Sequence, residues 1–299
     1  MKKGLVSIMI PTYNRPVLFE MTLISALSQD YPKTEILVCD NSTNDDTERR
    51  VQKYLTDSRL TYRRNRDAKT KAENFAPFEQ MAQGEYLQWL MDDDILAPDK
   101  LSKMVEVFNK HKNVALVTNQ RLVIDINNDP INQHKLPFPI KSPYSIYPAE
   151  FVAWLSLREA FNLFGEPPTY LFRRRDLTHH YWRADCKGMI VISDVAMALE
   201  VLEKGDIAIF REPLSFYRRH GGQEGQQVDT VLLSRLEWNE LNKDYLARQV
   251  FPYTETDYLT LLQKLVVEYD ERFYKLEKRA SAEMWARYTA FIDEVRSKI

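Results

Sequence analysis

The chain has 299 residues, of which 44% are hydrophobic and 28% are charged, and its formal net charge is -2. This length is enough to bury the core of one large domain, with or without an appendage, and the composition is that of an ordinary globular protein. A net charge so near zero gives no basic field to attract nucleic acid, so we expect no nucleic-acid partner.

Cysteine content and hydropathy indicate where the protein acts. The two cysteines, Cys39 and Cys186, form no C-x-x-C motif, which favours a reducing cytoplasm over an oxidising compartment. We find no run of about 20 apolar residues of the kind that spans a bilayer. The sequence therefore predicts a cytoplasmic protein, and it leaves open a peripheral contact with the inner face of the membrane.

The first third of the chain alternates short apolar runs with segments of helical periodicity. The predicted strands are 5–10, 35–39, 59–63 and 86–91, and the predicted helices are 17–29, a segment ending near 55, and 71–82. This alternation is typical of a mostly parallel sheet with helices on both faces, and continuous apolar strands fit a sheet that is covered on both sides. The predicted fold class is therefore α/β.

The rest of the chain changes character twice. We predict a helix over 100–112, a strand over 114–118, a proline-rich loop or lid over 127–148, and helices near 150–163 and 193–204. From residue 228 onward, apolar residues such as Leu259, Leu262 and Val266 recur at intervals of three and four, which is typical of helices. We therefore predict one domain over 1–227 and a helical C-terminal region over 228–299.

Three polar clusters, residues 12–15, 40–46 and 92–94, follow predicted strands. Ligands of open α/β sheets bind beyond the carboxyl ends of the strands, so we expect the clusters to converge on one crevice. The sharpest is Asp92-Asp93-Asp94, because three consecutive carboxylates repel one another and are most stable beside a cation. Hard divalent metals such as Mg²⁺ or Mn²⁺ take such oxygen ligands. The alternative is a solvated turn that caps the next helix.

Asp40 and Asp194 are further candidates with ordinary alternatives. Asp40 follows the second predicted strand, where a carboxylate can accept a hydrogen bond from the imide of uracil or thymine, but a turn or N-cap aspartate has the same sequence context. Ser193-Asp194 stands at the start of a predicted helix, where both residue types are common caps.

Several motifs together resemble one known family. They are Pro11-Thr12-Tyr13-Asn14-Arg15 after the first strand, 38–45 after the second, and Gly84-Glu85-Tyr86 leading into the aspartates, followed by 170–174, 193–194, 205, 212–214 and 217–220. In order and spacing they resemble family 2 glycosyltransferases of the GT-A fold, over about residues 4 to 222. Ser193 departs from that family's pattern, in which Glu precedes Asp.

The resemblance implies roles on the donor side of a binding site. Residues implied to bind a nucleotide-sugar are Pro11, Thr12, Tyr13, Arg15, Asp40, Asn74, Asp92 and Asp93. Tyr13 would stack on the base and Asp40 would hold it. Asp94 and His220 are the implied ligands of Mn²⁺ or Mg²⁺, although the triplet can be registered in two ways, which leaves open which aspartate touches the metal.

On the acceptor side, the resemblance implies that Asp194 is the general base that removes a proton from the acceptor hydroxyl. The implied protein is an inverting, metal-dependent glycosyltransferase that moves a hexosyl or N-acetylhexosaminyl group. Its donor would be a UDP- or dTDP-sugar and its acceptor a saccharide, a lipid-linked saccharide or a protein, in the synthesis of bacterial surface glycans or glycoconjugates.

Two other functions stay open at this point. One is a non-catalytic nucleotide-sugar-binding or scaffold protein of the same fold. The other is a nucleotidyltransferase, although residues 11–15 lack the glycine expected of its phosphate loop. The C-terminal helices have several uses to be tested: packing on the first domain, pairing in a homo-oligomer, or contact with an acceptor protein or a membrane surface.

Overall fold

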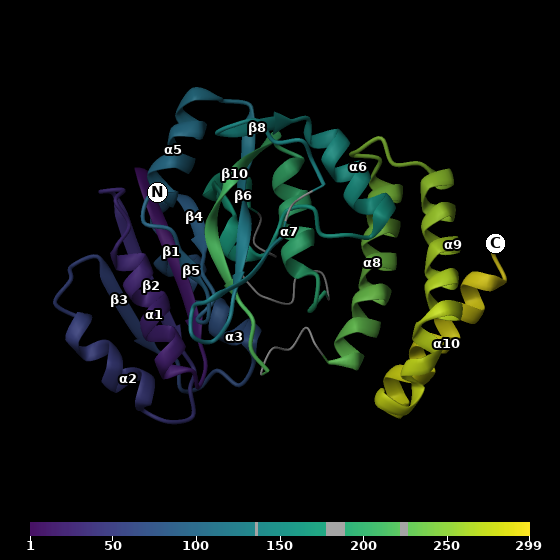
Figure 1. Ribbon diagram of the computed structural model, residues 1–299, viewed down its shortest axis with the longest axis horizontal. Helices are drawn as coiled ribbons and strands as arrows, with labels where there is room; N and C mark the ends of the chain where they lie inside the picture. The colour runs from purple at the N-terminus through teal and green to yellow at the C-terminus, as the bar shows by residue number, and fades with distance from the viewer. Residues whose placement is uncertain (135–136, 178–188, 222–226) are drawn as a thin grey trace.

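The computed structural model describes residues 1–134, 137–177, 189–221 and 227–299 (Figure 1). Its strands are β1 (Lys2–Thr12), β2 (Thr34–Asp40), β3 (Leu60–Arg64), β4 (Gly84–Trp89), β5 (Ile95–Leu96), β6 (Val114–Ile124), β7 (Pro130–His134), β8 (Tyr144–Tyr147), β9 (Leu171–Arg173) and β10 (Asp206–Arg218). Its helices are α1 (Pro16–Leu27), α2 (Asp46–Val51), α3 (Lys71–Phe75), α4 (Phe78–Met81), α5 (Lys100–Lys110), α6 (Ala149–Glu159), α7 (Ser193–Leu202), α8 (Val228–Arg248), α9 (Glu255–Glu271) and α10 (Ala282–Arg296).

Within the described residues the strands form one ten-stranded sheet, in the order β3-β2-β1-β4-β9-β6-β10-β5, with β7 paired to β6 and β8 to β10. β1, β2, β3 and β4 pair in parallel, and so do β6 and β10. The short β9 joins these two groups by antiparallel pairing with β4 and β6. The predicted α/β class is confirmed, and the parallel strands β1, β2 and β4 end at one edge of the sheet.

Helices cover both faces of this sheet (Figure 1). One hydrophobic cluster joins side chains of β1 and β2 to α1 and α5, and includes Ile8, Ile36, Leu23 and Leu101. The other lies on the opposite face, because successive side chains of a strand point to opposite sides. It joins Met9 and Leu37 to residues of α6, α7, α8 and α9. Burial on both faces explains why the strands read as continuous apolar runs.

Two predicted segments are wrong in detail. The helix predicted over 71–82 is divided into α3 and α4 at Pro77, which has no backbone N–H to continue a helical ladder. The stretch 127–148, predicted as a loop or lid, contains β7 and β8, which pair with the sheet. Pro130 is the first residue of β7, a position that a strand tolerates for proline.

Strand β6 is longer than predicted, running to Ile124 instead of ending at Thr118. Its middle residues, including Asn119, are polar and yet buried. Asn119 is matched by Lys100, whose buried Nζ donates hydrogen bonds to Asn119 Oδ1 at 2.6 Å, Thr169 O at 2.9 Å and Ser215 Oγ at 3.1 Å. Because buried polar groups need such partners, a polar stretch can lie inside a sheet only when another element supplies them.

The C-terminal helices share the core of the sheet and add a cluster of their own. Trp238 and Leu241 of α8 and Leu265 of α9 lie in the cluster that includes α6 and α7, whereas Leu232, Tyr288 and Ile292 join α8 to α10. Helix α8 begins at Val228, but the domain boundary after residue 227 stays a prediction. No helix in the described part of the chain is long and apolar enough to cross a bilayer.

Gly205, between α7 and β10, provides a test of this packing. A Cβ atom at Gly205 would lie 2.1 Å from the backbone oxygen of Asn113, which accepts the hydrogen bond of Asp206 N. We expect Gly205→Ala to destabilise the protein by about 1–3 kcal/mol through overpacking, and thus to lower the melting temperature. Gly221→Ala is the matched control, since nothing lies within 4 Å of the Cβ it would add. Equal melting temperatures for both variants would contradict this account.

Candidate active site

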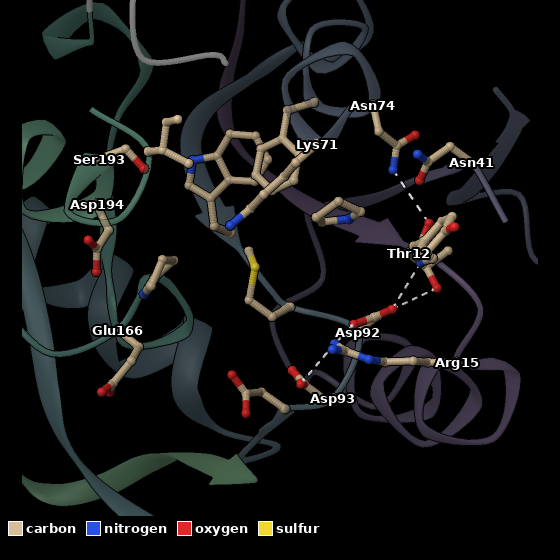
Figure 2. Close-up of a pocket in the computed structure, with 18 of the residues that line it drawn as sticks. Thr12, Arg15, Asn41, Lys71, Asn74, Asp92, Asp93, Glu166, Ser193 and Asp194 are labelled. Carbon is tan, nitrogen blue, oxygen red and sulfur yellow. Dashed lines mark hydrogen bonds and ion pairs between the residues drawn. The ribbon is translucent and has the colours of Figure 1, made fainter. Parts of the chain in front are cut away.

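A cavity of about 580 Å³ opens at the sheet edge where the parallel strands end (Figure 2). This volume lies in the range of small-molecule sites. The residues that line it are Pro11, Thr12, Tyr13, Arg15, Asn41, Lys69, Lys71, Asn74, Phe75, Trp89, Met91, Asp92, Asp93, Asp94, Glu166, Pro167, Ile190, Val191, Ser193, Asp194, Met197 and Tyr217. The segments after β1 and β4 therefore converge as predicted, and Asp194 lies in the same cavity.

The three consecutive aspartates are buried, and hydrogen-bond donors surround their carboxylates. Asp92 accepts hydrogen bonds from Thr12 Oγ1 at 2.9 Å, from the backbone N–H of Tyr13 at 3.1 Å and from Arg15 at 3.0 Å. Burial, reinforced by the charge of Asp93, raises the pKa of Asp92 to about 6. The alternative of a solvated turn is wrong, because Asp92 is only 6% exposed and the N-cap residue of α5 is Asp99.

Asp93 is held by Arg15 and His220, and Asp94 is held by Arg218 at the end of β10. Asp93 Oδ2 contacts Arg15 Nη1 and His220 Nε2, each at 3.0 Å. Asp94 Oδ1 accepts a hydrogen bond from the backbone N–H of Arg218 at 2.8 Å, and burial raises the pKa of Asp94 well above its usual value. His220 does not line the cavity, but through Asp93 it lies beside the predicted metal position.

Asp40 lies outside the cavity lining. Its carboxylate is fully buried, accepts hydrogen bonds from Tyr62 Oη at 2.6 Å and Ser42 N at 2.8 Å, and forms an ion pair with Arg64 at 2.8 Å. In this structure Asp40 thus stabilises the turn after β2, as in the turn alternative. Contact with a nucleotide base would require Tyr62 or Arg64 to move, and it stays a prediction; the neighbouring Asn41 reaches the cavity instead.

The other residues predicted to bind the nucleotide-sugar line the cavity, and one of them, Asn74, also holds two strands together. Tyr13 is 51% exposed at the rim, where an aromatic ring can stack on a base. Asn74 lines the cavity, but its buried amide donates to Cys39 O at 3.0 Å and Thr12 O at 3.4 Å, which ties the ends of β1 and β2 together. Pro11 and Thr12 lie at the end of β1 and face the same cavity.

Asp194 lies across the cavity from Asp92 and Asp93 (Figure 2). It occupies the first turn of α7, whose N-cap residue is Ile192, and its carboxylate interacts with the backbone N–H of Val195, as expected of an aspartate at a helix start. Asn162 Nδ2 contacts Asp194 Oδ2 at 3.3 Å. Burial raises the pKa of Asp194 to about 7; the backbone N–H of Val195 and the charge of Lys71 oppose this shift, and the charge of Glu166 adds to it.

Several residues that line the cavity were not predicted from the sequence, among them Lys71, Trp89 and Glu166. Lys71 follows Thr70, which forms a capping box with Glu73. This motif is visible in the sequence and could have predicted that Lys71 lies at the start of a helix. Trp89 is the last residue of β4 and stacks on Phe75, with centroids 4.9 Å apart. Glu166 stands in no motif, and only tertiary structure brings it to the cavity.

The family model for glycosyl transferase family 2 matches residues 7–182. The chain belongs to this family. It is 35% identical over 106 residues to a GalNAc(5)-diNAcBac-PP-undecaprenol β-1,3-glucosyltransferase of Campylobacter jejuni, a match over 35% of this chain and 34% of the relative. It is 32% identical over 124 residues to the Escherichia coli UDP-Glc:α-D-GlcNAc-diphosphoundecaprenol β-1,3-glucosyltransferase WfgD, over 42% and 48%. The chain thus spans about a third to a half of the length of these curated relatives.

Solved structures agree on the fold. Staphylococcus aureus TarS residues 1–349, in complex with UDP-GlcNAc, superposes with a TM-score of 0.62 at 14% identity, over 97% of this chain and 81% of that one. The mannosyltransferase PcManGT of Pyrobaculum calidifontis, in complex with GDP-Man and Mn²⁺, gives 0.52 at 15%, over 98% and 86%. These likenesses confirm the predicted GT-A fold, and the family identifies the protein as a glycosyltransferase.

The raised pKa of Asp194 has a consequence for the stability of this family 2 enzyme. The folded state binds this proton more tightly than the unfolded chain, so the carboxyl destabilises the fold increasingly as the pH rises from about 4 to about 7. We expect Asp194→Asn to melt several degrees above the wild type at pH 8, and the gap to narrow toward pH 4, in thermal melts at both pH values.

Asp57 supplies a control of opposite sign. The hydrogen bond from Arg59 lowers the pKa of Asp57, so this carboxylate stabilises the fold above its unfolded pKa and the effect is lost as the pH falls. Asp57→Asn is thus expected to lower the melting temperature at pH 8. A gap between Asp194→Asn and wild type that does not change with pH would contradict the assigned shift.

Proposed function

We propose that this glycosyltransferase transfers glucose, with inversion, from UDP-glucose to a saccharide carried on a lipid diphosphate. The observation that carries the proposal is the placement of Asp194 in one cavity with the buried aspartates 92–94, on opposite walls. Such a site has an anion-rich wall for a metal and diphosphate and a separate carboxylate for the acceptor. The family assignment favours this reaction over the scaffold and nucleotidyltransferase alternatives.

The substrates of the relatives support the choice of donor and acceptor. The WfgD relative is described as using UDP-Glc and an α-D-GlcNAc-diphosphoundecaprenol acceptor, and the Campylobacter relative as a glucosyltransferase on an undecaprenol-linked saccharide. TarS has been solved with UDP-GlcNAc. We propose a uridine nucleotide on this basis. A lipid-linked acceptor would place the enzyme at a membrane surface, so we also propose peripheral contact with the inner face of the membrane.

The proposed chemistry needs one base and one leaving group. Asp194 would accept the proton of an acceptor hydroxyl as that oxygen forms a bond to the anomeric carbon, on the face opposite the leaving UDP. The bond between that carbon and the diphosphate oxygen breaks, and its electron pair leaves with UDP. A carboxyl with a pKa of about 7 is well matched to this role, because a base whose pKa lies near the working pH transfers protons efficiently.

The residues beside Asp93 fit a divalent metal by their chemistry. Carboxylate oxygens of Asp93 and Asp94 and the imidazole of His220 are donors that Mn²⁺ accepts, and Mg²⁺ takes the carboxylates. Among the described residues, no three His, Cys, Asp or Glu side chains are already arranged around one position. Binding would therefore exchange the contacts of Asp93 with Arg15 or His220 for the metal. The metal would neutralise charge on the departing diphosphate.

The donor site can be tested by thermal shift with UDP, dTDP, GDP and CMP, each with and without Mn²⁺. We expect UDP to raise the melting temperature by several degrees when Mn²⁺ is present, because a ligand at 100 times its dissociation constant stabilises the native state by about 2.7 kcal/mol. Asp94→Asn should lose the metal-dependent part of this shift. Asp99→Asn, which changes a partly exposed aspartate outside the cavity lining, should keep it.

Two outcomes would count against the proposal. The absence of a shift with any nucleotide, in protein shown to be folded, would remove the donor site. A shift with GDP or CMP alone would mean that the donor carries that nucleotide instead of a uridine nucleotide.

A further inference from the structure

Glu166 brings a further carboxylate to the cavity, where neither the sequence motifs nor the proposed mechanism gives it a role. It lies between α6 and β9, immediately before Pro167, and its side chain is 27% exposed. In Figure 2 it stands on the wall that carries Asp194, across from Asp92 and Asp93. It lines the same cavity as Asp94 and Asp194, and its charge adds to the raised pKa of Asp194. Glu166 therefore faces the space between the metal position and the base.

A cation fixes one end of this carboxylate. Arg121 Nε lies 2.6 Å from Glu166 Oε2, and the Arg121 guanidinium lies over the ring of Tyr217, 5.8 Å from its centroid. Both of these atoms are buried, and Arg121 opposes, by its charge and by hydrogen bonding, the rise that burial causes in the pKa of Glu166. Arg121 thus holds Oε2 of Glu166, which leaves the other carboxylate oxygen, Oε1, to accept a hydrogen bond from a ligand.

The backbone of Glu166 is set by its neighbours. Its carbonyl accepts hydrogen bonds from Thr169 N at 2.8 Å and Thr169 Oγ1 at 2.7 Å. The preceding Gly165 has a φ of +95°, and its N–H donates to Asn162 Oδ1 at 3.1 Å. The same Asn162 contacts Asp194, so one side chain fixes both carboxylates relative to each other. Preorganised groups of this kind fix the orientation of a ligand.

A hexose attached to a diphosphate at Asp93 and Asp94, with its anomeric carbon toward Asp194, would lie in front of Glu166. We propose that Glu166 accepts a hydrogen bond from a hydroxyl of the hexose that is transferred, and so makes the site select a nucleotide-sugar over the free nucleotide. This inference rests on the proposed function. It assigns Glu166 to recognition of the sugar, and it leaves proton transfer to Asp194.

The test compares the binding of UDP and UDP-glucose by isothermal titration calorimetry in the presence of Mn²⁺. For Glu166→Gln and Glu166→Ala we expect an unchanged dissociation constant for UDP and one about 10-fold or more higher for UDP-glucose, since a hydrogen bond to a charged group is lost. Glu212→Gln removes an exposed carboxylate on β10 and is the matched control. Equal weakening of both ligands, or of neither, would overturn the proposal.

A measurement on the wild type keeps the proposal falsifiable even if the variants fold poorly. UDP-glucose analogues that lack one hydroxyl, at C2, C3, C4 or C6, are titrated in turn. We expect one analogue to bind the wild type only as tightly as UDP-glucose binds Glu166→Ala. The dissociation constant of that analogue should be the same for the wild type and for Glu166→Ala. If every analogue binds wild type as well as UDP-glucose does, Glu166 recognises no hydroxyl.

The acid limb of the pH profile for glucose transfer from UDP-glucose adds an independent readout. Among the described residues, the charged or titratable groups that act on Asp194 include Glu166, Lys71 and Tyr170. Removing the Glu166 charge should move this limb to lower pH, whereas an unmoved limb would contradict the placement. If UDP itself fails to bind the wild type, the proposed function is wrong. If UDP and UDP-glucose both bind, but the Glu166 variants do not weaken UDP-glucose more than UDP, only this inference is wrong.

Discussion

Three consecutive buried carboxylates can stay together only if other segments surround them with donors, and the architecture of this site follows from that constraint. Arg15 reaches Asp92 and Asp93 from the segment after β1, and His220 reaches Asp93 from beyond β10. Arg218, fully buried, donates its backbone N–H to Asp94 and its Nε to the backbone oxygen of Asp93, each at 2.8 Å. The turn of residues 92–94 thereby connects the segment after β1 with β10 and the residues after it.

This arrangement separates two kinds of carboxylate by environment. The aspartates 92–94 lie among cations and N–H donors, a setting that a divalent metal and a diphosphate can share. Asp194, on α7 at the opposite wall, lacks an ion-pair partner of this kind among the described residues, and burial raises its pKa to about 7. Groups whose surroundings push their pKa values apart are suited to different tasks. On this account the sheet edge binds the donor, and α7 provides the base for the acceptor.

Local motifs predicted much of this site, and tertiary contacts account for what they missed. The aspartate triplet and Arg15 were readable because each follows an apolar strand, and parallel strands end at one edge. Asp40 has the same sequence context, but Tyr62 and Arg64 enclose it, a pairing no local pattern reveals. Glu166 stands in no motif, and its position in the cavity depends on an ion pair with the distant Arg121. The polar half of β6 looked unlike a strand because its partner, Lys100, comes from α5.

The central claim is that Asp194 acts as the base opposite a donor site, and single-turnover transfer tests it most directly. Transfer from UDP-glucose to a short-chain lipid diphosphate bearing N-acetylglucosamine is compared between wild type and Asp194→Asn, alongside the affinity of each for UDP-glucose. The account predicts a rate lowered by about 10²–10⁴-fold with unchanged donor affinity, since general-base catalysis contributes about that much. Transfer by Asp194→Asn at the wild-type rate would contradict it.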